Sequence, residues 1–181
     1  MVNLERIFGR LGNKLFQYAF IYDYAKRNGL DYYYQDPKFF AESVNDLKVL
    51  FGQDIVPINQ VAIHVRRGDY VGNKFYVDLM NTDYYTKAIS MFPDENFLVF
   101  SDDIDFCKNL ALFKGHRFEF SEGNDEITDL NLMAGCKGVI IANSSFSWWG
   151  AFLSKGKVIA PIAWYSDGIE RTKCPSNWIR I

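Results

Sequence analysis

Several features that would mark a secreted, membrane-spanning or nucleic-acid-binding protein are missing from these 181 residues. The longest apolar runs fall far short of the roughly 20 residues that a transmembrane helix needs. The N-terminus carries charges and then glycines instead of the apolar core of a signal peptide. The formal net charge is only −2, with acidic and basic residues mixed along the chain, so no basic surface for nucleic acid is expected. We therefore expect a cytoplasmic protein without a nucleic-acid partner. Whether it binds as a peripheral protein to the inner face of a membrane is left open.

Cysteine and histidine are also scarce. Cys107, Cys136 and Cys174 are odd in number and far apart, no Cys-x-x-Cys pair exists, and His64 and His116 are the only histidines. Neither a disulfide framework nor a zinc site is expected on these grounds. The pattern predicts buried free thiols in a reducing compartment.

Apolar residues, in contrast, make up 49% of the chain, enough for the core of one domain or two small ones. From residue 61 onward, short apolar runs alternate with stretches of helical spacing. The predicted strands are 61–65, 97–100, 117–120, 139–142 and 158–160, and the predicted helices between them are 82–91, 104–112, 126–136 and 146–153. Such alternation predicts an open parallel sheet with helices on both faces, which binds ligands at the carboxyl ends of its strands.

Upstream of this pattern, a glycine-rich turn, Gly9-Arg10-Leu11-Gly12-Asn13-Lys14, precedes a predicted helix over 15–27. Glycines at a helix start let backbone amides approach a phosphate. The spacing is not that of a Walker loop, and a plain turn explains the segment equally well. A short strand over 31–35 and a helix over 41–50 are expected to follow.

The most informative segment for function is His64-Val65-Arg66-Arg67-Gly68-Asp69-Tyr70, which runs from the end of the predicted strand 61–65 into a loop. Two arginines at a strand end are costly unless they face water or an anion. An arginine fork makes two parallel hydrogen bonds to a phosphate and keeps its charge through any reaction. A solvated basic pair is the alternative.

Acidic residues follow the next strand, in Ser101-Asp102-Asp103-Ile104-Asp105. A carboxylate at a strand end can accept two hydrogen bonds from a guanine edge or from ribose hydroxyls. Capping of the next helix by Asp102 or Asp103 is the alternative. Metal binding is not expected here, because the paired arginines already supply positive charge.

A serine-rich segment, Asn143-Ser144-Ser145-Phe146-Ser147-Trp148-Trp149-Gly150, lies between a predicted strand and helix. Backbone N–H groups are unpaired at such a junction, which suits a diphosphate. A single capping serine is the alternative, although it accounts for one serine out of three. The two tryptophans are expected to pack in the core.

Together these ordered segments resemble glycosyltransferase family 11, the bacterial α-1,2-fucosyltransferases, and similar motifs occur in α-1,6- and protein-O-fucosyltransferases. The resemblance covers both ends of the chain and nearly all of 61–160. The matching motifs are 9–18, 64–70, 101–103 and the run from 129–133 through 143–151.

The resemblance implies a GT-B-like arrangement of two Rossmann-type halves, with the nucleotide sugar in the carboxyl half. Only 14–60 separates the glycine-rich turn from His64, which is too short for a full Rossmann half. We therefore predict a reduced amino-terminal, acceptor-side module at 1–59 and a GDP-sugar-binding domain at 60–181.

The resemblance also implies a function: transfer of L-fucose from GDP-fucose to the 2-hydroxyl of a galactose-terminated glycan, with inversion and without a metal or other cofactor. Arg66 would stabilise the β-phosphate, and Asp69 is the nearest candidate for the base. The residues implied to bind the donor are Gly12, Asn13, His64, Arg66, Arg67, Asp102, Ser144, Ser145 and Phe146.

Two other readings stay open at this point. The chain could be a catalytically silent module that binds a GDP-sugar, or a doubly wound domain of unrelated function. A homodimer, in which a second copy completes the cleft, would link the silent module with the active enzyme.

Overall fold

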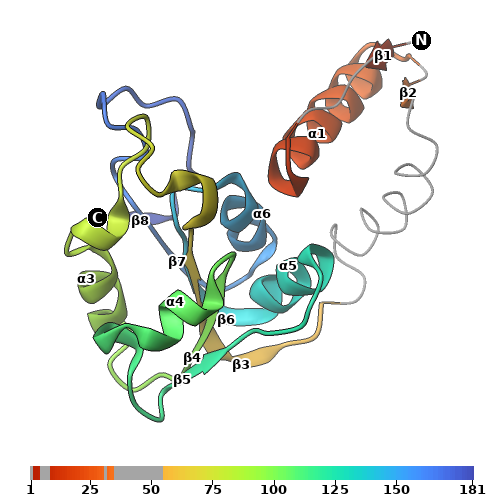
Figure 1. Cartoon of the computed structure of the whole chain (residues 1–181). Coiled ribbons are helices and arrows are strands. Elements are labelled where there is room, and N and C mark those ends of the chain that lie inside the picture. The colour runs from red at the N-terminus through yellow and green to blue at the C-terminus, as the bar shows by residue number, and fades with distance from the viewer. Residues whose placement is uncertain (1, 5–8, 31, 35–54) are drawn as a thin grey trace. The chain divides into compact units, whose positions relative to one another are not determined.

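The computed structural model describes residues 2–4, 9–30, 32–34 and 55–181 (Figure 1). The chain forms two compact units that divide between Asp54 and Ile55. The helix expected at 41–50 lies outside the described residues.

In the amino-terminal unit, strand β1 (Val2–Leu4) pairs in parallel with β2 (Tyr32–Tyr34), and helix α1 (Leu11–Arg27) connects them. α1 ends where Gly29 takes a φ of +60°, which suits glycine, and the Leu30 N–H donates to the Ala25 carbonyl. The helix begins four residues earlier than predicted. Gly12 and Asn13 therefore lie in its first turn, and the turn itself is confined to Gly9 and Arg10.

The carboxyl unit is built on a sheet of six parallel strands in the order β5-β4-β3-β6-β7-β8. Their bounds are β3 Ile58–Val65, β4 Phe97–Ser101, β5 Phe118–Phe120, β6 Cys136–Ile140, β7 Lys157–Ala160 and β8 Ile179–Arg180. The predicted α/β parallel sheet is confirmed. Its strand order is that of the Rossmann fold, and the order reverses between β3 and β6.

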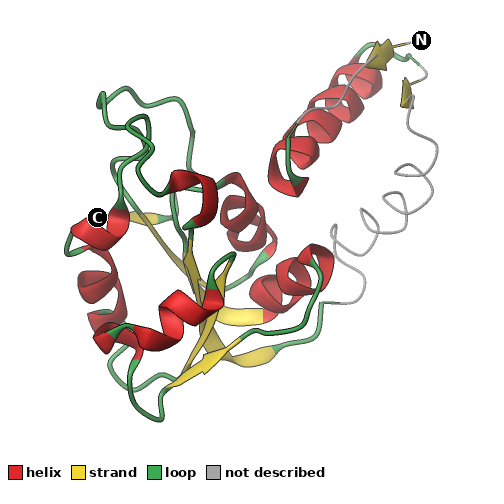
Figure 2. Ribbon diagram, in the orientation of Figure 1, coloured by secondary structure: helices red, strands yellow, loops and turns green. Residues whose placement is uncertain are grey.

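Four helices connect these strands: α3 Tyr84–Ser90, α4 Ile104–Asn109, α5 Glu126–Gly135 and α6 Ser145–Leu153. Figures 1 and 2 show α3 and α4 on one face of the sheet and α5 and α6 on the other. The predicted helix over 104–112 is shorter than expected because Leu110 is extended, and a separate 3₁₀ turn follows at Ala111–Phe113.

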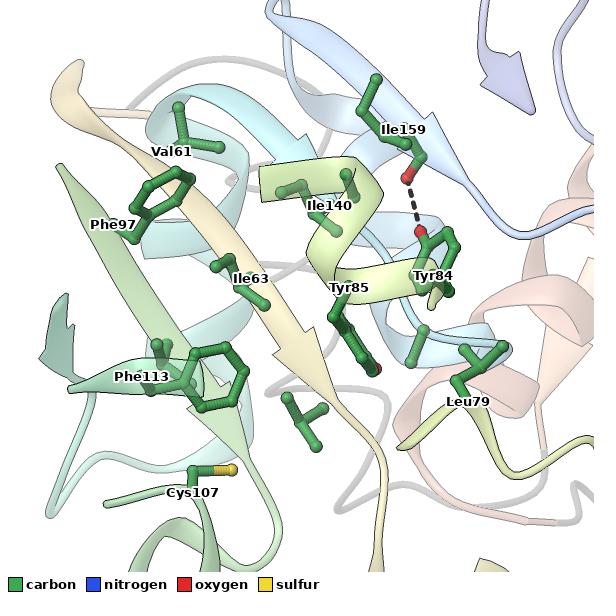
Figure 3. Close-up of a cluster of buried hydrophobic side chains, with 14 of the residues drawn as sticks. Val61, Ile63, Leu79, Tyr84, Tyr85, Phe97, Cys107, Phe113, Ile140 and Ile159 are labelled. Carbon is green, nitrogen blue, oxygen red and sulfur yellow. Dashed lines mark hydrogen bonds between the residues drawn. The ribbon is translucent and has the colours of Figure 1, made fainter. Parts of the chain in front are cut away.

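Alternate residues of the central strands supply the core between the sheet and the first pair of helices, as a strand's two-residue period requires. Val61, Ile63 and Phe97 are fully buried there (Figure 3). Two tyrosines of α3 complete this core. The Tyr84 hydroxyl donates to the Ile141 and Ile159 carbonyls at 2.6 and 3.1 Å, and the Tyr85 hydroxyl donates to the His64 carbonyl at 2.9 Å.

These three hydrogen bonds join α3 to the carboxyl ends of β3, β6 and β7, so the helix holds these strand ends in place. Burial raises the pKa of both tyrosines well above the usual value, so both hydroxyls stay protonated donors.

The cysteines follow the sequence prediction at two of three positions. Cys107 and Cys136 are buried free thiols, whereas Cys174 is a free thiol that is partly exposed. Trp148 and Trp149 are both buried, as predicted. In the part of the chain that the structure describes, no helix combines the length and apolarity needed to cross a bilayer.

Candidate functional site

The polar residues singled out in the sequence follow β3, β4 and β6, the strands on either side of the point where strand order reverses. In open parallel sheets this is where a crevice forms and ligands bind. Arg66 and Asp102 each come directly after a strand, and Asn143 follows β6 by three residues. Arg66, Arg67, Tyr70 and Asn143 line one small pocket there.

Arg66 is held between two carboxylates. Its Nη1 lies 2.7 Å from Asp102 Oδ2, and its Nη2 pairs with Asp69 Oδ1. The Arg66 side chain is only 10% exposed, while that of Asp69 is 65% exposed and that of Asp102 is 20% exposed. The Tyr70 ring lies against the guanidinium, 5.1 Å from Cζ to the ring centre. Arg66 is therefore a fixed, desolvated cation and not a solvated one.

Arg67 points elsewhere. Its guanidinium stacks on the Phe106 ring of α4 at 3.8 Å, and its Nη1 lies 3.9 Å from Asp78. Its Nε is buried and has no hydrogen-bond partner within the described part of the chain. The predicted pair is thus two cations with different surroundings: Arg66 is paired with two carboxylates, and Arg67 is packed on an aromatic ring.

The turn that presents the arginines depends on Gly68. This residue has a φ of +29°, and a Cβ added there would run into Asp102 Oδ2. The Arg67 N–H donates to Asp102 Oδ1 at 2.8 Å, so one carboxylate holds both the backbone and the Arg66 side chain. The next three residues, Gly68–Tyr70, form a 3₁₀ turn. Gly68 is therefore needed where the chain passes closest to Asp102.

On the other side of the switch point, Asn143 is 3% exposed and acts as a clamp. Its Nδ2 donates to the Val77 carbonyl at 2.8 Å and to the Trp164 carbonyl at 3.0 Å. Its own carbonyl accepts from the Tyr70 hydroxyl at 3.2 Å. The residue joins the loop after β3 to the loop after β7, and both N–H donors of its side-chain amide are used in doing so.

Ser144 is the N-cap residue of α6, but its side chain makes no capping hydrogen bond. Ser147 is fully buried and its hydroxyl donates to the Ala142 and Ser144 carbonyls at 3.4 and 3.3 Å. The capping alternative weighed for this segment is thus not realised by Ser144 through its side chain. The separate capping alternative for the acidic segment is realised at Asp103, whose Oδ1 accepts from the Phe106 N–H at the start of α4.

His64 is buried at the end of β3, 4% exposed, and its ring lies 5.4 Å from that of Phe146 on α6. Burial, with a smaller contribution from the Arg66 charge, lowers the pKa of His64 to about 3, so the imidazole is neutral near pH 7. Its Nδ1 has no hydrogen-bond partner among the described residues. A buried polar atom of this kind costs stability unless a partner reaches it.

The structure therefore brings together seven of the predicted residues: His64, Arg66, Arg67, Asp69, Asp102, Ser144 and Phe146. Ser145 opens α6 beside them. Gly12 and Asn13 belong to α1 in the other unit, and their approach to a phosphate stays a prediction. Within the described residues, no three histidine, cysteine, aspartate or glutamate side chains are gathered as a metal site would require.

Sequence reasoning missed the residues that hold this arrangement. Asn143 was considered only as part of the segment predicted to bind a diphosphate, and Tyr84, Tyr85 and Phe106 fell within predicted helices without any role assigned to them. Each contacts a group 21 or more residues away in the sequence. The two tyrosines and Asn143 donate hydrogen bonds to backbone carbonyls, and the Phe106 ring stacks on the Arg67 guanidinium. Only the polar Asn143 at a strand end carried a signal for this role.

Fold and site together define a Rossmann-type α/β domain with a fixed arginine at its switch point and a helix N-terminus beside it. The chain belongs to glycosyl transferase family 11, whose family model matches residues 8–181. The resemblance stated from the motifs is thereby confirmed.

Curated relatives agree with this assignment. The chain is 36% identical over 180 residues to an alpha-1,2-colitosyltransferase of Escherichia coli, covering 82% of this chain and 61% of that protein. It is 32% identical over 150 residues to the O-antigen biosynthesis glycosyltransferase WbnK of Escherichia coli, covering 76% of this chain and 49% of that protein. A galactoside alpha-(1,2)-fucosyltransferase 1 of Saimiri sciureus is 27% identical over 113 residues, covering 57% and 31%. The chain thus spans between about half and three fifths of the two bacterial relatives. No solved structure matches.

Proposed function

We propose that this chain transfers L-fucose from GDP-fucose to the 2-hydroxyl of a terminal galactose in a glycan, with inversion at the sugar carbon. The observation that carries the proposal is the fixed Arg66 at the carboxyl end of β3, in a pocket shared with Asn143 at the switch point. Family membership supports a glycosyltransferase. Relatives named for α-1,2 transfer of colitose and of fucose support a deoxyhexose and a 2-linkage.

In the proposed reaction, the acceptor oxygen bonds to C1 of the sugar while the bond from C1 to the β-phosphate oxygen breaks. Negative charge grows on the leaving GDP, and the preorganised Arg66 guanidinium stabilises it in a partly buried site. The proposal assigns this task to Arg66, with Arg67 in support, and not to a metal ion. The proton of the acceptor hydroxyl passes to a carboxylate, for which Asp69 on the same turn is the candidate.

The start of α6 would complete the donor site. The first N–H groups of a helix point out of its N-terminus toward a bound anion, and the helix dipole adds to that attraction. Ser144 and Ser145 stand at this start, and Phe146 with neutral His64 forms the adjoining wall. That the chain forms a homodimer, and that it binds to a membrane as a peripheral protein, both remain predictions.

The test is a transfer assay on the full chain with GDP-fucose and a β-galactoside such as lactose, following both GDP release and the linkage of the product. A second reaction with GDP-colitose as donor compares the two deoxyhexoses. Arg171→Ala is the control, since that exposed arginine pairs with Asp167 in another loop.

A 2-linked fucosyl product would establish the proposal. Donor binding without release of GDP would support the silent module instead. A chain that binds neither donor nor GDP would contradict both.

A further inference from the structure

The carboxylate Asp102 was expected to contact the nucleoside, and its surroundings indicate a different task. Both of its oxygens already serve the turn after β3: Oδ2 lies 2.7 Å from Arg66 Nη1, and Oδ1 accepts the Arg67 N–H at 2.8 Å. Gly68 passes so close to Oδ2 that any Cβ there would collide with it. Three consecutive residues of one strand end are thus fitted around one side chain from the neighbouring strand.

A second carboxylate, Asp69, also pairs with Arg66, and the two are not equivalent. The Asp69 side chain is 65% exposed and that of Asp102 is 20% exposed. Exposed ion pairs contribute little and exchange readily, whereas a partly buried pair with an additional backbone bond is harder to separate. With both carboxylates in place, the cluster of one cation and two anions would repel an incoming diphosphate. One carboxylate must therefore leave Arg66, and Asp69, the more exposed of the two, can turn away from the guanidinium.

We infer that Asp102 is a positioning residue that holds Arg66 and the Arg67-Gly68 turn for the donor's diphosphate, and that Asp69 is the carboxylate which the diphosphate displaces. This inference rests on the proposed function, because it assumes that a nucleoside diphosphate binds at Arg66. It differs from a nucleoside-binding role for Asp102, because its effect reaches the ligand only through Arg66.

The test compares the affinities of full-chain variants for three probes: GDP, inorganic pyrophosphate and guanosine. Asp102→Asn is nearly isosteric and keeps an oxygen for the Arg67 N–H, but it loses the charge that orients Arg66. We expect GDP and pyrophosphate to bind about 10-fold or more weakly, as for a lost charge-assisted hydrogen bond. Guanosine affinity should stay within about twofold, since nothing in its contacts has changed.

Two further variants separate positioning from general damage. Arg66→Ala combined with Asp102→Asn should bind GDP no more weakly than Arg66→Ala alone, because groups that act as one unit are not additive. Asp69→Asn should bind GDP as tightly as the unaltered chain or more tightly. Asp103→Asn is the matched control, since asparagine also caps a helix and should preserve all three affinities.

Equal losses for guanosine and GDP in Asp102→Asn would overturn the inference and restore the nucleoside contact, as would additive losses in the double variant. Weaker GDP binding by Asp69→Asn would overturn the displacement. If Asp102→Asn does not fold, Asp102→Glu keeps the charge but moves it by one methylene, and it should show the same selective loss of GDP and pyrophosphate. Failure of the unaltered chain to bind GDP would instead contradict the proposed function itself.

Discussion

The two sides of the switch point hold their residues by different means. After β3, the turn at Arg66 is fixed by charge, through Asp102 and Asp69. After β6, Asn143 fixes its loop through neutral, buried hydrogen bonds to two distant carbonyls. Charge on the first side leaves a cation that can exchange partners with an anionic ligand. Neutral hydrogen bonds on the second side hold the start of α6 rigidly. The turn after β3 is therefore suited to binding a ligand, and the loop after β6 is suited to keeping the shape of the site.

The largest expected effect falls on the charged side. Arg66→Ala should lower the rate of transfer by about 100-fold or more, as removal of one preorganised anion-stabilising group costs on the order of 3 kcal/mol of barrier. Steady-state kinetics with saturating acceptor measures this, with Arg171→Ala as the control. A rate within a fewfold of the unaltered chain would show that the growing charge is stabilised elsewhere.

On the neutral side the expected effect is on folding. Asn143→Ala removes the donor to the Val77 carbonyl and leaves the Trp164 carbonyl with only the Val77 N–H, and it should lower the free energy of unfolding by about 2 kcal/mol. Denaturant unfolding monitored by tryptophan fluorescence checks this. The exposed Asn177, substituted in the same way, should change stability by less than about 0.5 kcal/mol. Equal effects of the two changes would remove Asn143 from its role as a clamp.

His64 lies between the two sides and should make stability depend on pH. Its folded pKa of about 3 is below the ordinary value, so between pH 6.5 and 3 the unfolded chain takes up a proton that the folded chain does not. Stability is therefore complete above about pH 6.5 and falls as the pH drops, by at most about 1.4 kcal/mol per pH unit.

Unfolding at pH 7 and pH 5 tests this effect. The unaltered chain should lose about 2 kcal/mol more than His64→Gln across this interval. Replacement of the exposed His116 by Gln is the matched control. If His64→Gln kept the full acid sensitivity, another group would have to carry it.

The smallest effect is expected at Ser144. Its side chain makes no capping bond, so Ser144→Ala should alter stability by less than about 0.5 kcal/mol, below the usual cost of removing a capping serine. GDP affinity should nevertheless fall severalfold if the hydroxyl contacts the diphosphate. Calorimetric titration of this variant beside Ser154→Ala, whose hydroxyl bonds a backbone carbonyl far from α6's start, measures both. A loss of stability without a loss of affinity would leave Ser144 a cap and nothing more.

Much of the fold follows from local patterns. The strands and helices of 61–160 were predictable because their apolar residues recur at two- or three-to-four-residue spacing, and their alternation predicts a parallel sheet, although not the order of its strands. Strand β8 was not predicted, since its two residues, Ile179 and Arg180, are both exposed and form no pattern. The start of α1 at Leu11 was missed because Gly12 and Asn13 favour a turn by propensity.

The site was predictable in membership but not in geometry. Arg66 and Asp102 were both expected at strand ends, yet nothing in the sequence indicated that they would pair with each other. Asp102 meets the Arg67 N–H from 35 residues away, across neighbouring strands, and Asn143 clamps a carbonyl 66 residues away. Such contacts depend on strand order and register, which short motifs do not encode.

The most direct test of the central claim, that Arg66 binds the second phosphate of the nucleotide, compares GDP with GMP by calorimetry. The unaltered chain should bind GDP at least about 10-fold more tightly than GMP, because the added phosphate meets a fixed guanidinium. In Arg66→Ala the two nucleotides should bind with nearly equal affinity. A preference for GDP that survives in Arg66→Ala would contradict the account.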